Sequence, residues 1–160
     1  MKNNIYTSFE QNKTLFSALL DACGDHGKQY KIIEDVNRKP LSYKNIILQS
    51  ILLSIFVRKD SSISENIGIM LPNTNTLPIL FFALQFIGRV PAMLNFSSGA
   101  FAIRRACETA QIKIIYTSKL FIEKAKLENT VKELNKKYTI YYLEDIKEKI
   151  SITSKISAFL

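Results

Sequence analysis

Few residues of this chain combine the types and spacings that chemistry requires. The sequence contains 1 His and 2 Cys. His26 lies in a glycine-rich turn with no acid or nucleophile placed near it by pattern, so a surface or helix-end histidine is favoured over a general base. Cys23 and Cys107 fall in apolar helical patterns without metal-ligand spacing. We therefore predict reduced thiols in a core, and no zinc or iron site.

Two adjacent carboxylate pairs, Glu34-Asp35 and Glu144-Asp145, are the next candidates for acid–base chemistry. Each pair lies at the end of a predicted strand, where neighbouring side chains point to opposite faces. Neither pair can then form a catalytic dyad by itself. We predict solvated strand ends at both places.

Candidate sites for phosphate are sparse. Neither G-x-x-x-x-G-K-[ST] nor G-x-G-x-x-G occurs, and 5 glycines leave no phosphate-binding loop. The Ser-Ser-Gly run at 97–99 could bind an anion at a helix start, although helix capping alone explains it. Arg104 and Arg105 fit a solvated helix face better than a ligand clamp. The Tyr-Thr-Ser run at 116–118 ends a strand, where open α/β sheets usually bind ligands. These patterns assign no catalytic, cofactor-binding or metal-binding residue.

The composition is that of an ordinary globular domain. The chain has 160 residues, 47% hydrophobic and 22% charged, which suits one domain or one piece of a larger one. The net charge of +8 raises the question of a polyanionic partner. Most lysines alternate with acidic residues, whereas nucleic-acid surfaces more often cluster arginine with stacking aromatics, so we predict no nucleic-acid partner.

No targeting or membrane segment is predicted. The first 13 residues, MKNNIYTSFEQNK, contain no apolar region of the kind a secretory signal has. The longest apolar run, 77–87, is interrupted by Pro78 and Gln85 and falls short of the roughly 20 residues that a bilayer span needs. We expect a cytoplasmic protein.

The first third of the chain predicts helices around a short extended segment. Residues 1–12 are polar and expected to be flexible. Thr14 can cap a helix that Gly24 and Gly27 end, and residues 31–35 read as a strand before a turn at 37–40. Ser42 can cap a second helix over 43–57. This second helix is apolar on most sides, which is typical of a helix buried in something larger or paired with a partner.

From residue 67 onward the pattern alternates between strands and helices. Strands are predicted at 67–71, 90–94, 113–118 and 138–143. Helices are predicted between them: one from Thr74 or Asn75 to Ile87, one after residues 97–98 with a stripe of small residues, and one over 119–137 that breaks near Glu128. Short connections and right-handed crossovers make this an α/β fold with a mostly parallel, doubly wound sheet and helices on both faces. Residues 146–160 are expected to form a weakly structured or truncated tail.

Several short segments, in order along the chain, carry a family resemblance. They are Leu71-Pro72-Asn73, the run 90–95 of the V-P-x-x-N type, and the segments 15–20, 33–37, 67–73, 112–118 and 142–145. The sequence thereby resembles the N-terminal part of the large domain of AMP-forming acyl-activating enzymes. It is most similar to the branch that joins a 2-acylglycerophosphoethanolamine acyltransferase to an acyl-[acyl-carrier-protein] synthetase. On this resemblance, residues 13–145 would be a partial AMP-binding domain.

The resemblance implies a function that this sequence carries only in part. The family uses ATP and Mg²⁺ to convert a fatty acid into an acyl-adenylate; the acyl group then passes to acyl carrier protein and, in this branch, to a lysophospholipid. The family's phosphate loop, its adenine and ribose motifs and its catalytic lysine have no counterpart before Leu160. We therefore expect a fragment that binds no cofactor alone and is inactive alone. The segment would be either truncated, or split and complemented by a second chain that carries the remainder of the synthetase. The lipid substrate implies a peripheral position at the inner membrane.

Two other functions stay open at this point. A free-standing α/β module could bind a partner or a lipid surface through the apolar helix 43–57 and a basic face. A small nucleotide- or RNA-binding domain would show salt-dependent retention on RNA. The first hypothesis, the acyl-activating fragment, is the one we favour.

Overall fold

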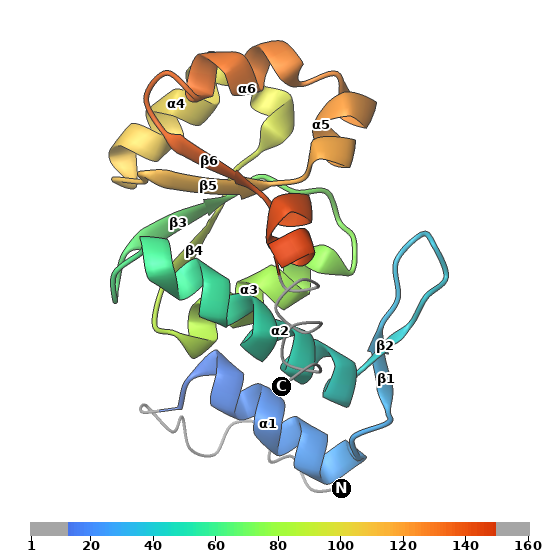
Figure 1. Ribbon diagram of the computed structural model, residues 1–160. Helices are drawn as coiled ribbons and strands as arrows, with labels where there is room; N and C mark the ends of the chain where they lie inside the picture. Colours follow the sequence, from blue (N-terminus) through green and yellow to red (C-terminus); the bar gives the residue numbers. More distant parts are fainter. Residues whose placement is uncertain (1–12, 150–160) are drawn as a thin grey trace, which may run out of the picture.

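A computed structural model describes residues 13–149, and its centre is a four-stranded parallel sheet (Figure 1). The strand order is β4-β3-β5-β6. The strands are β3 (Asn66–Ile69), β4 (Val90–Met93), β5 (Ile114–Thr117) and β6 (Thr139–Tyr142). All three strand pairings are parallel. The predicted parallel α/β sheet is thus confirmed, with strand ends within one or two residues of the expected ones.

Helices cover both faces of the sheet, as the sequence predicts (Figure 1). One face carries α2 (Tyr43–Val57) and α3 (Thr76–Phe86), and the other carries α4 (Gly99–Thr109), α5 (Lys119–Ala125) and α6 (Glu128–Leu134). Side chains alternate along each strand, so successive residues pack into the helical layers on opposite faces of the sheet. Ile67 and Ile69 belong to the α2–α3 layer, while Met70 and Ile115 belong to the α4–α6 layer.

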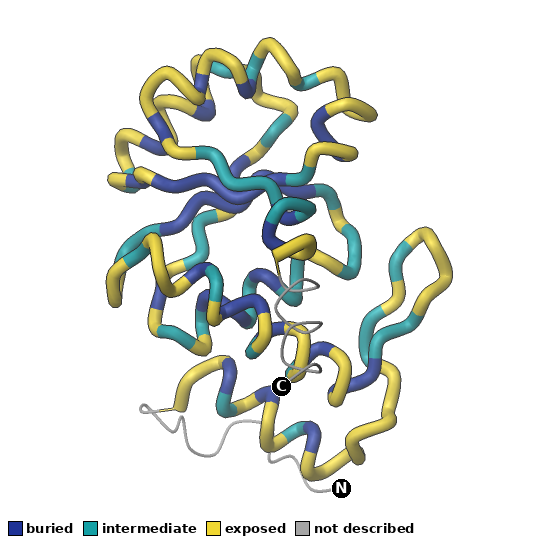
Figure 2. Tube along the Cα trace, in the orientation of Figure 1, coloured by how far each residue is buried: buried dark blue, intermediate teal, exposed yellow. Residues whose placement is uncertain are grey.

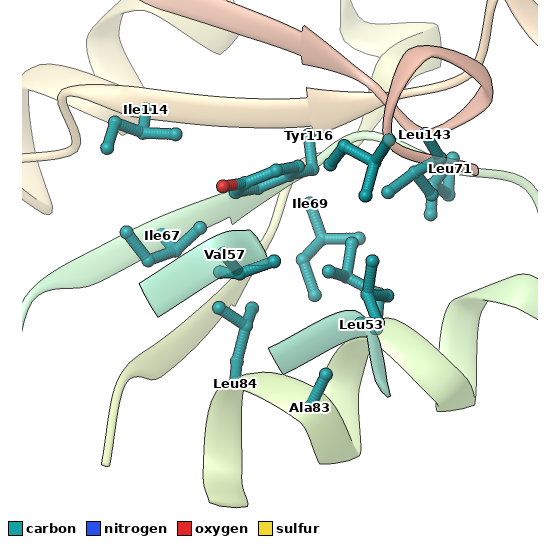
Figure 3. Close-up of a cluster of buried hydrophobic side chains, with 12 residues drawn as sticks. Leu53, Val57, Ile67, Ile69, Leu71, Ala83, Leu84, Ile114, Tyr116 and Leu143 are labelled. Carbon is teal, nitrogen blue, oxygen red and sulfur yellow. The ribbon is translucent and has the colours of Figure 1, made fainter. Parts of the chain in front are cut away.

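The core on the α2–α3 side is continuous from the sheet to the helices. Figure 3 shows Tyr116 lying beneath the sheet among aliphatic side chains from β3, α2 and α3. Val57, Leu80 and Leu84 are at most 1% exposed. Burial raises the pKa of the Tyr116 phenol far above its ordinary value, so this group stays protonated and has a packing role.

A smaller N-terminal unit packs below α2. It consists of α1 (Leu15–His26) and an antiparallel pair, β1 (Lys31–Ile33) with β2 (Leu41–Ser42). Thr14 caps α1 and Ser42 caps α2, as predicted. Gly24 lies inside α1 rather than ending it, and Gly27, at φ 92°, is the residue that stops the helix.

Three predicted details differ in the structure. The helix α3 begins after Asn75 without a side-chain cap, and Asn95 rather than a serine caps the turn η2 (Phe96–Ser98) that precedes α4. Only part of the small-residue stripe of α4 packs into the core: Ile103 and Cys107 are buried, whereas Ala102 and Ala106 are exposed. The predicted break between α5 and α6 is confirmed, and it occurs at Lys126, which adopts a left-handed conformation.

The end of the described chain is more ordered than its pattern suggests. Residues 143–149 are helical, and Leu143 and Ile146 are buried in the core on the α2–α3 side. Residues 146–149, predicted to belong to a weakly structured tail, are therefore part of this helix. The rest of that tail, 150–160, and the N-terminal segment 1–12 lie outside the described residues.

The outer face of α2 is apolar and exposed. Leu48 and Leu52 are each 48% exposed and Ile55 is 53% exposed, at the helical spacing that places them on one side. Figure 2 shows exposed stretches of this helix alternating with buried ones. Within residues 13–149 nothing covers this stripe, which agrees with the prediction of a helix apolar on most sides. No helix in that range has the length and apolarity to cross a membrane.

Candidate functional site

The candidate site is a groove of about 820 Å³ at the carboxyl edge of the sheet. Its walls come from the segments after β3, β5 and β6, from the loop that joins β1 to β2, and from α2 and α5. This is the edge at which open parallel sheets bind their ligands. The apolar lining comprises Val36, Leu52, Leu53, Leu71, Pro72, Ile79, Leu120, Phe121, Ala125 and Leu143.

The floor of the groove is held in place by buried contacts between strand ends. Thr117, fully buried at the end of β5, donates its hydroxyl to the carbonyl of Met70 at 2.7 Å. The next residue in the chain, Leu71, is itself buried and begins the groove lining. Of the predicted ligand position at 116–118, Ser118 lines the groove, whereas Tyr116 and Thr117 are core residues.

Asp35 fixes the loop on one side of the groove. Its carboxylate accepts hydrogen bonds from the backbone amides of Asn37 at 2.9 Å and Asn75 at 3.1 Å. The Asn75 amide in particular, helped by Asn37 and Lys39, lowers the pKa of Asp35 below its ordinary value. Asp35 therefore ties the β1–β2 loop to the start of α3.

Glu144 fixes the opposite side. Its carboxylate accepts the Ser118 hydroxyl at 2.6 Å and the backbone amides of Lys119 at 3.0 Å and Leu120 at 3.3 Å, so it anchors the first turn of α5. Burial tends to raise the pKa of Glu144, but these hydrogen bonds outweigh it and the pKa lies below its ordinary value. Asp145 forms an ion pair with Lys119.

The prediction of solvated strand ends is therefore wrong for one member of each carboxylate pair. Asp35 and Glu144 are partly buried and bonded to backbone amides, whereas Glu34 is exposed and pairs with Arg38 at 3.4 Å. The reason is tertiary. The Asp35 and Glu144 carboxylates satisfy helix-start amides that lie 40 and about 25 residues away in the sequence.

The remaining sequence candidates do not converge on the groove. His26 is exposed at the end of α1, with its ring centroid 5.6 Å from that of Tyr30, which confirms a helix-end histidine. At the start of α4, Ser98 donates its hydroxyl to the Asn95 carbonyl at 2.7 Å and makes no side-chain cap, so the predicted serine cap is wrong. Arg104 and Arg105 are both exposed, as predicted for a solvated face.

The two cysteines are buried and unpaired, as predicted. Burial, together with the nearby Glu108, raises the pKa of the Cys107 thiol to about 11, so this thiol is unreactive while the fold is intact. Among residues 13–149, no cluster of three His, Cys, Asp or Glu side chains could hold a metal ion.

Two basic side chains lie in the groove opposite its two carboxylates. Lys124 on α5 and Lys147 on the final helix both line it and are exposed, and the described part of the chain records no ion pair for either. Sequence reasoning missed both lysines, as well as Glu144 as an anchor. The signal available was the position of segments 71–76, 118–125 and 143–147, each of which directly follows a strand of the same parallel sheet.

The comparisons place this fold among adenylating enzymes. No protein-family model matches the chain. The structure of VinN with 3-methylaspartate aligns with a TM-score of 0.70 at 18% identity, covering 86% of this chain and 36% of VinN. The Klebsiella oxytoca NpsA N-terminal subdomain in complex with anthranilyl-AMSN aligns at 0.61 and 18% identity, covering 70% of this chain and 29% of that chain.

A third structure, assigned as a long-chain-fatty-acid CoA ligase from Rhodopseudomonas palustris, aligns at 0.65 and 13% identity, covering 80% of this chain. This chain spans about a third of the length of the proteins it matches, at 36%, 29% and 31%. The fold is therefore that of the N-terminal part of adenylating enzymes, a group that includes adenylation domains and acyl-CoA ligases.

Proposed function

We propose that this chain provides the N-terminal part of an enzyme that forms acyl-adenylates. The observation that carries the proposal is the structural match over 86% of the chain to VinN, together with a ligand-sized groove at the carboxyl edge of the sheet. Residues 13–149 supply a scaffold and part of a binding surface. ATP and Mg²⁺ would bind to residues of the complete enzyme, because forming an acyl-adenylate needs preorganised groups for the phosphates and the metal.

The finer proposal is a fatty acyl-[acyl-carrier-protein] synthetase linked to lysophospholipid acylation. It is supported by the order of the segments from 15–20 to 142–145 in the sequence and by the apolar lining of the groove. Acyl carrier protein, fatty acid and lysophospholipid would then be partners of the complete enzyme, at the cytoplasmic side of the inner membrane. The chain alone would be inactive.

The exposed stripe of α2 supports a further part of the enzyme packing onto this one. Leu48, Leu52 and Ile55 form a regular apolar row whose exposure is costly in water unless another surface covers it. In the opposite layer, among the described residues, the large exposed apolar side chains Phe101 and Leu120 lie on separate helices. A covering domain would bury the stripe, whether it belongs to the same polypeptide or to a second one.

The test is an ATP–pyrophosphate exchange assay on the purified chain, alone and together with the product encoded directly downstream of it. We expect no exchange from the chain alone. With the downstream product present, we expect exchange that requires a fatty acid and is not driven by aspartate or aromatic acids. Exchange by the chain alone would contradict the proposal that it is inactive without the rest of the enzyme. Exchange driven only by amino acids would contradict the fatty-acid proposal.

A second candidate is a free-standing module that binds a lipid surface through the same α2 stripe. It is favoured by the combination of this apolar row with a net charge of +8. Cosedimentation with vesicles containing anionic lipid at low salt tests it. Binding that Leu48→Gln and Ile55→Gln abolish would support the module, and its absence would remove this candidate.

A further inference from the structure

We propose that the loop between β1 and β2, residues 34–40, is a hinged strap that forms one wall of the groove, and that Asp35 and Asn75 are the latch that holds it closed. The strap controls access to the groove. This role rests on the proposed function, because that function makes the groove a binding surface.

The strap is fixed at its two ends and exposed between them. Ile33 and Leu41, the residues on either side of it, pack against the small core below α2. Five of the seven strap residues are exposed, and Val36 is 86% exposed. The two strands that carry the strap are 3 and 2 residues long, and their pairing is irregular. Figure 1 shows the loop projecting beyond these strands. So short a strand pair does not hold the loop in place by itself.

The strap is braced within itself. The Asp35 carboxylate accepts the backbone amide of Asn37 at 2.9 Å, and the Asp35 carbonyl accepts the backbone amide of Arg38 at 3.0 Å. The guanidinium of Arg38 lies 3.4 Å from the carboxylate of Glu34. All of these contacts join near neighbours in the sequence, so they persist wherever the strap lies. The strap therefore moves as one piece and bends at its ends, as hinged loops do.

Asn75 holds the strap against the start of α3 through two hydrogen bonds. Its backbone amide donates to the Asp35 carboxylate at 3.1 Å, and its side-chain amide donates to the Lys39 carbonyl at 2.7 Å. Asp35 and Lys39 lie on opposite sides of the turn at 36–37, so one residue of α3's first turn fastens both arms of the strap. The other side of the latch is fixed, because α3 buries Leu80 and Leu84 in the core.

The closed latch leaves one polar atom unsatisfied. The side-chain oxygen of Asn75 is buried and accepts no hydrogen bond within residues 13–149. A buried acceptor without a donor is unfavourable, and release of the strap lets water reach this side chain. The penalty offsets part of what the two hydrogen bonds contribute. The closed state is therefore only moderately favoured, as in other loops that open locally.

Opening of the strap removes one wall of the groove and leaves the others in place. Asp35, Val36 and Asn37 line the groove from the strap, beside Thr74 and Thr76 at the start of α3. The walls from α2, α5 and the final helix stay, because each of these helices is anchored by side chains in the two cores. The groove then opens to solvent beside α3.

The first test measures the distance between the strap and the far wall of the groove. Spin labels are placed on the full-length chain at Val36→Cys in the strap and Lys124→Cys on α5, both of which are exposed positions. Cys23 and Cys107 are buried, so the two introduced thiols react first. Pulsed electron spin resonance then gives the distance distribution. We expect a dominant short distance and a minor longer one.

Variants of the latch should change the ratio of the longer to the shorter distance. Asp35→Asn, which removes the charged acceptor, should raise this ratio roughly threefold to tenfold. Asn75→Ala loses the bond to Lys39 but also the unsatisfied oxygen, so it should raise the ratio less, about twofold to threefold. Asn75 makes no side-chain cap for α3, so this change removes no helix cap. The matched control is Glu34→Gln, which alters a contact within the strap and should leave the ratio unchanged.

The second test measures access to the groove. In a separate chain, Thr74→Cys places a thiol in the groove beside the latch. Its rate of reaction with a bulky maleimide should rise in Asp35→Asn by the same factor as the distance ratio. The rate at Lys124→Cys, on the far wall, should not change. Amide hydrogen exchange in β3 and β5 checks that each variant keeps its fold.

A distance distribution that neither latch variant changes would overturn the strap, and so would an equal change in Glu34→Gln. Opening that occurs only together with loss of amide protection in β3 and β5 would show unfolding of the domain and would also overturn it. An unchanged reaction rate at Thr74→Cys in a chain whose strap has opened would overturn its control of access. These measurements use neither ATP nor a second protein, so their failure is distinguishable from failure of the exchange assay.

Discussion

The helices that cover the two faces of the sheet present different surfaces to solvent. On one face, α4 buries Ile103 and Cys107 and turns Arg104 and Arg105 outward. On the other, α2 buries an inner row of side chains and also presents Leu48, Leu52 and Ile55 outward. An amphipathic helix presents its polar side to water, whereas a helix that is apolar on both sides packs its second side against another protein surface. This difference is the structural basis for expecting a covering domain on the α2 side.

The largest expected effects come from the two cores themselves. Leu84 on α3 is fully buried and Leu134 on α6 is 1% exposed. We expect Leu84→Ala and Leu134→Ala each to lower the free energy of unfolding by about 2–5 kcal/mol, because both leave a cavity. Urea denaturation measures this. A much smaller loss for Leu84→Ala would mean that the α2–α3 layer is loosely packed. The exposed apolar side chains of α2 would then reflect poor folding and not the absence of a covering domain.

Gly68 tests how tightly the α4–α6 layer is packed. A Cβ atom at this position would lie 2.9 Å from Leu94 Cδ1 and 3.1 Å from Ile115 Cγ1. We expect Gly68→Val to cost about 1–3 kcal/mol of unfolding free energy through overpacking. The matched control is Gly24→Ala inside α1, where nothing lies within 4 Å and where a gain of roughly 0.5–1 kcal/mol is expected. Equal outcomes at the two glycines would contradict close packing at Gly68.

Glu144 joins the final helix to α5 across the groove. We expect Glu144→Gln to lower the free energy of unfolding by about 1 kcal/mol at pH 7, since a charged acceptor of three hydrogen bonds becomes neutral. The folded pKa of Glu144 is depressed, so its contribution is present above the unfolded value and is lost as the pH falls through the folded value. The difference between the two proteins should therefore shrink below about pH 4. A difference independent of pH would exclude this anchor role.

The smallest effect on stability is expected on the outer face of α2. Leu48→Gln with Ile55→Gln should change the unfolding free energy by less than about 0.5 kcal/mol per site, because both side chains are half exposed. Self-association of the isolated chain and binding of a hydrophobic dye should both fall. Sedimentation velocity and dye fluorescence measure these, with Ala102→Gln on α4 as the control. Unchanged association would show that the stripe is not adhesive.

The elements of the fold were predictable because their signals are local. Thr14 and Ser42 sit directly before apolar helical runs, and each accepts the backbone amide three residues later, as capping residues do. The strands are short apolar runs between turn residues. The stripe of small residues on α4 is a weaker signal, since Ala102 and Ala106 have the spacing of a packed face but are small enough to be exposed at little cost.

The groove was not predictable because its walls meet only in three dimensions. Val36, Leu52 and Leu120 come from three elements, and no periodicity relates their positions. The same holds for the anchors: Asp35 bonds to an amide 40 residues away and Glu144 to a hydroxyl 26 residues away. The sequence does predict which edge of the sheet carries the site, because that follows from parallel topology alone.

Pro91 makes the two edges of the four-stranded sheet unequal as places where a further strand could pair. Val90 and Leu94 donate their amides to Glu65 and Ile69, so the intervening nitrogen of Pro91 faces away from β3 and carries no hydrogen to offer a newcomer. At the other margin Thr139 donates toward Lys113, which leaves the amides of Ile140 and Tyr142 turned outward, with no strand of the 13–149 segment beside them. An additional strand, from any polypeptide, would meet an uninterrupted row of backbone amides at the edge of β6. At the edge of β4 that row is interrupted at Pro91.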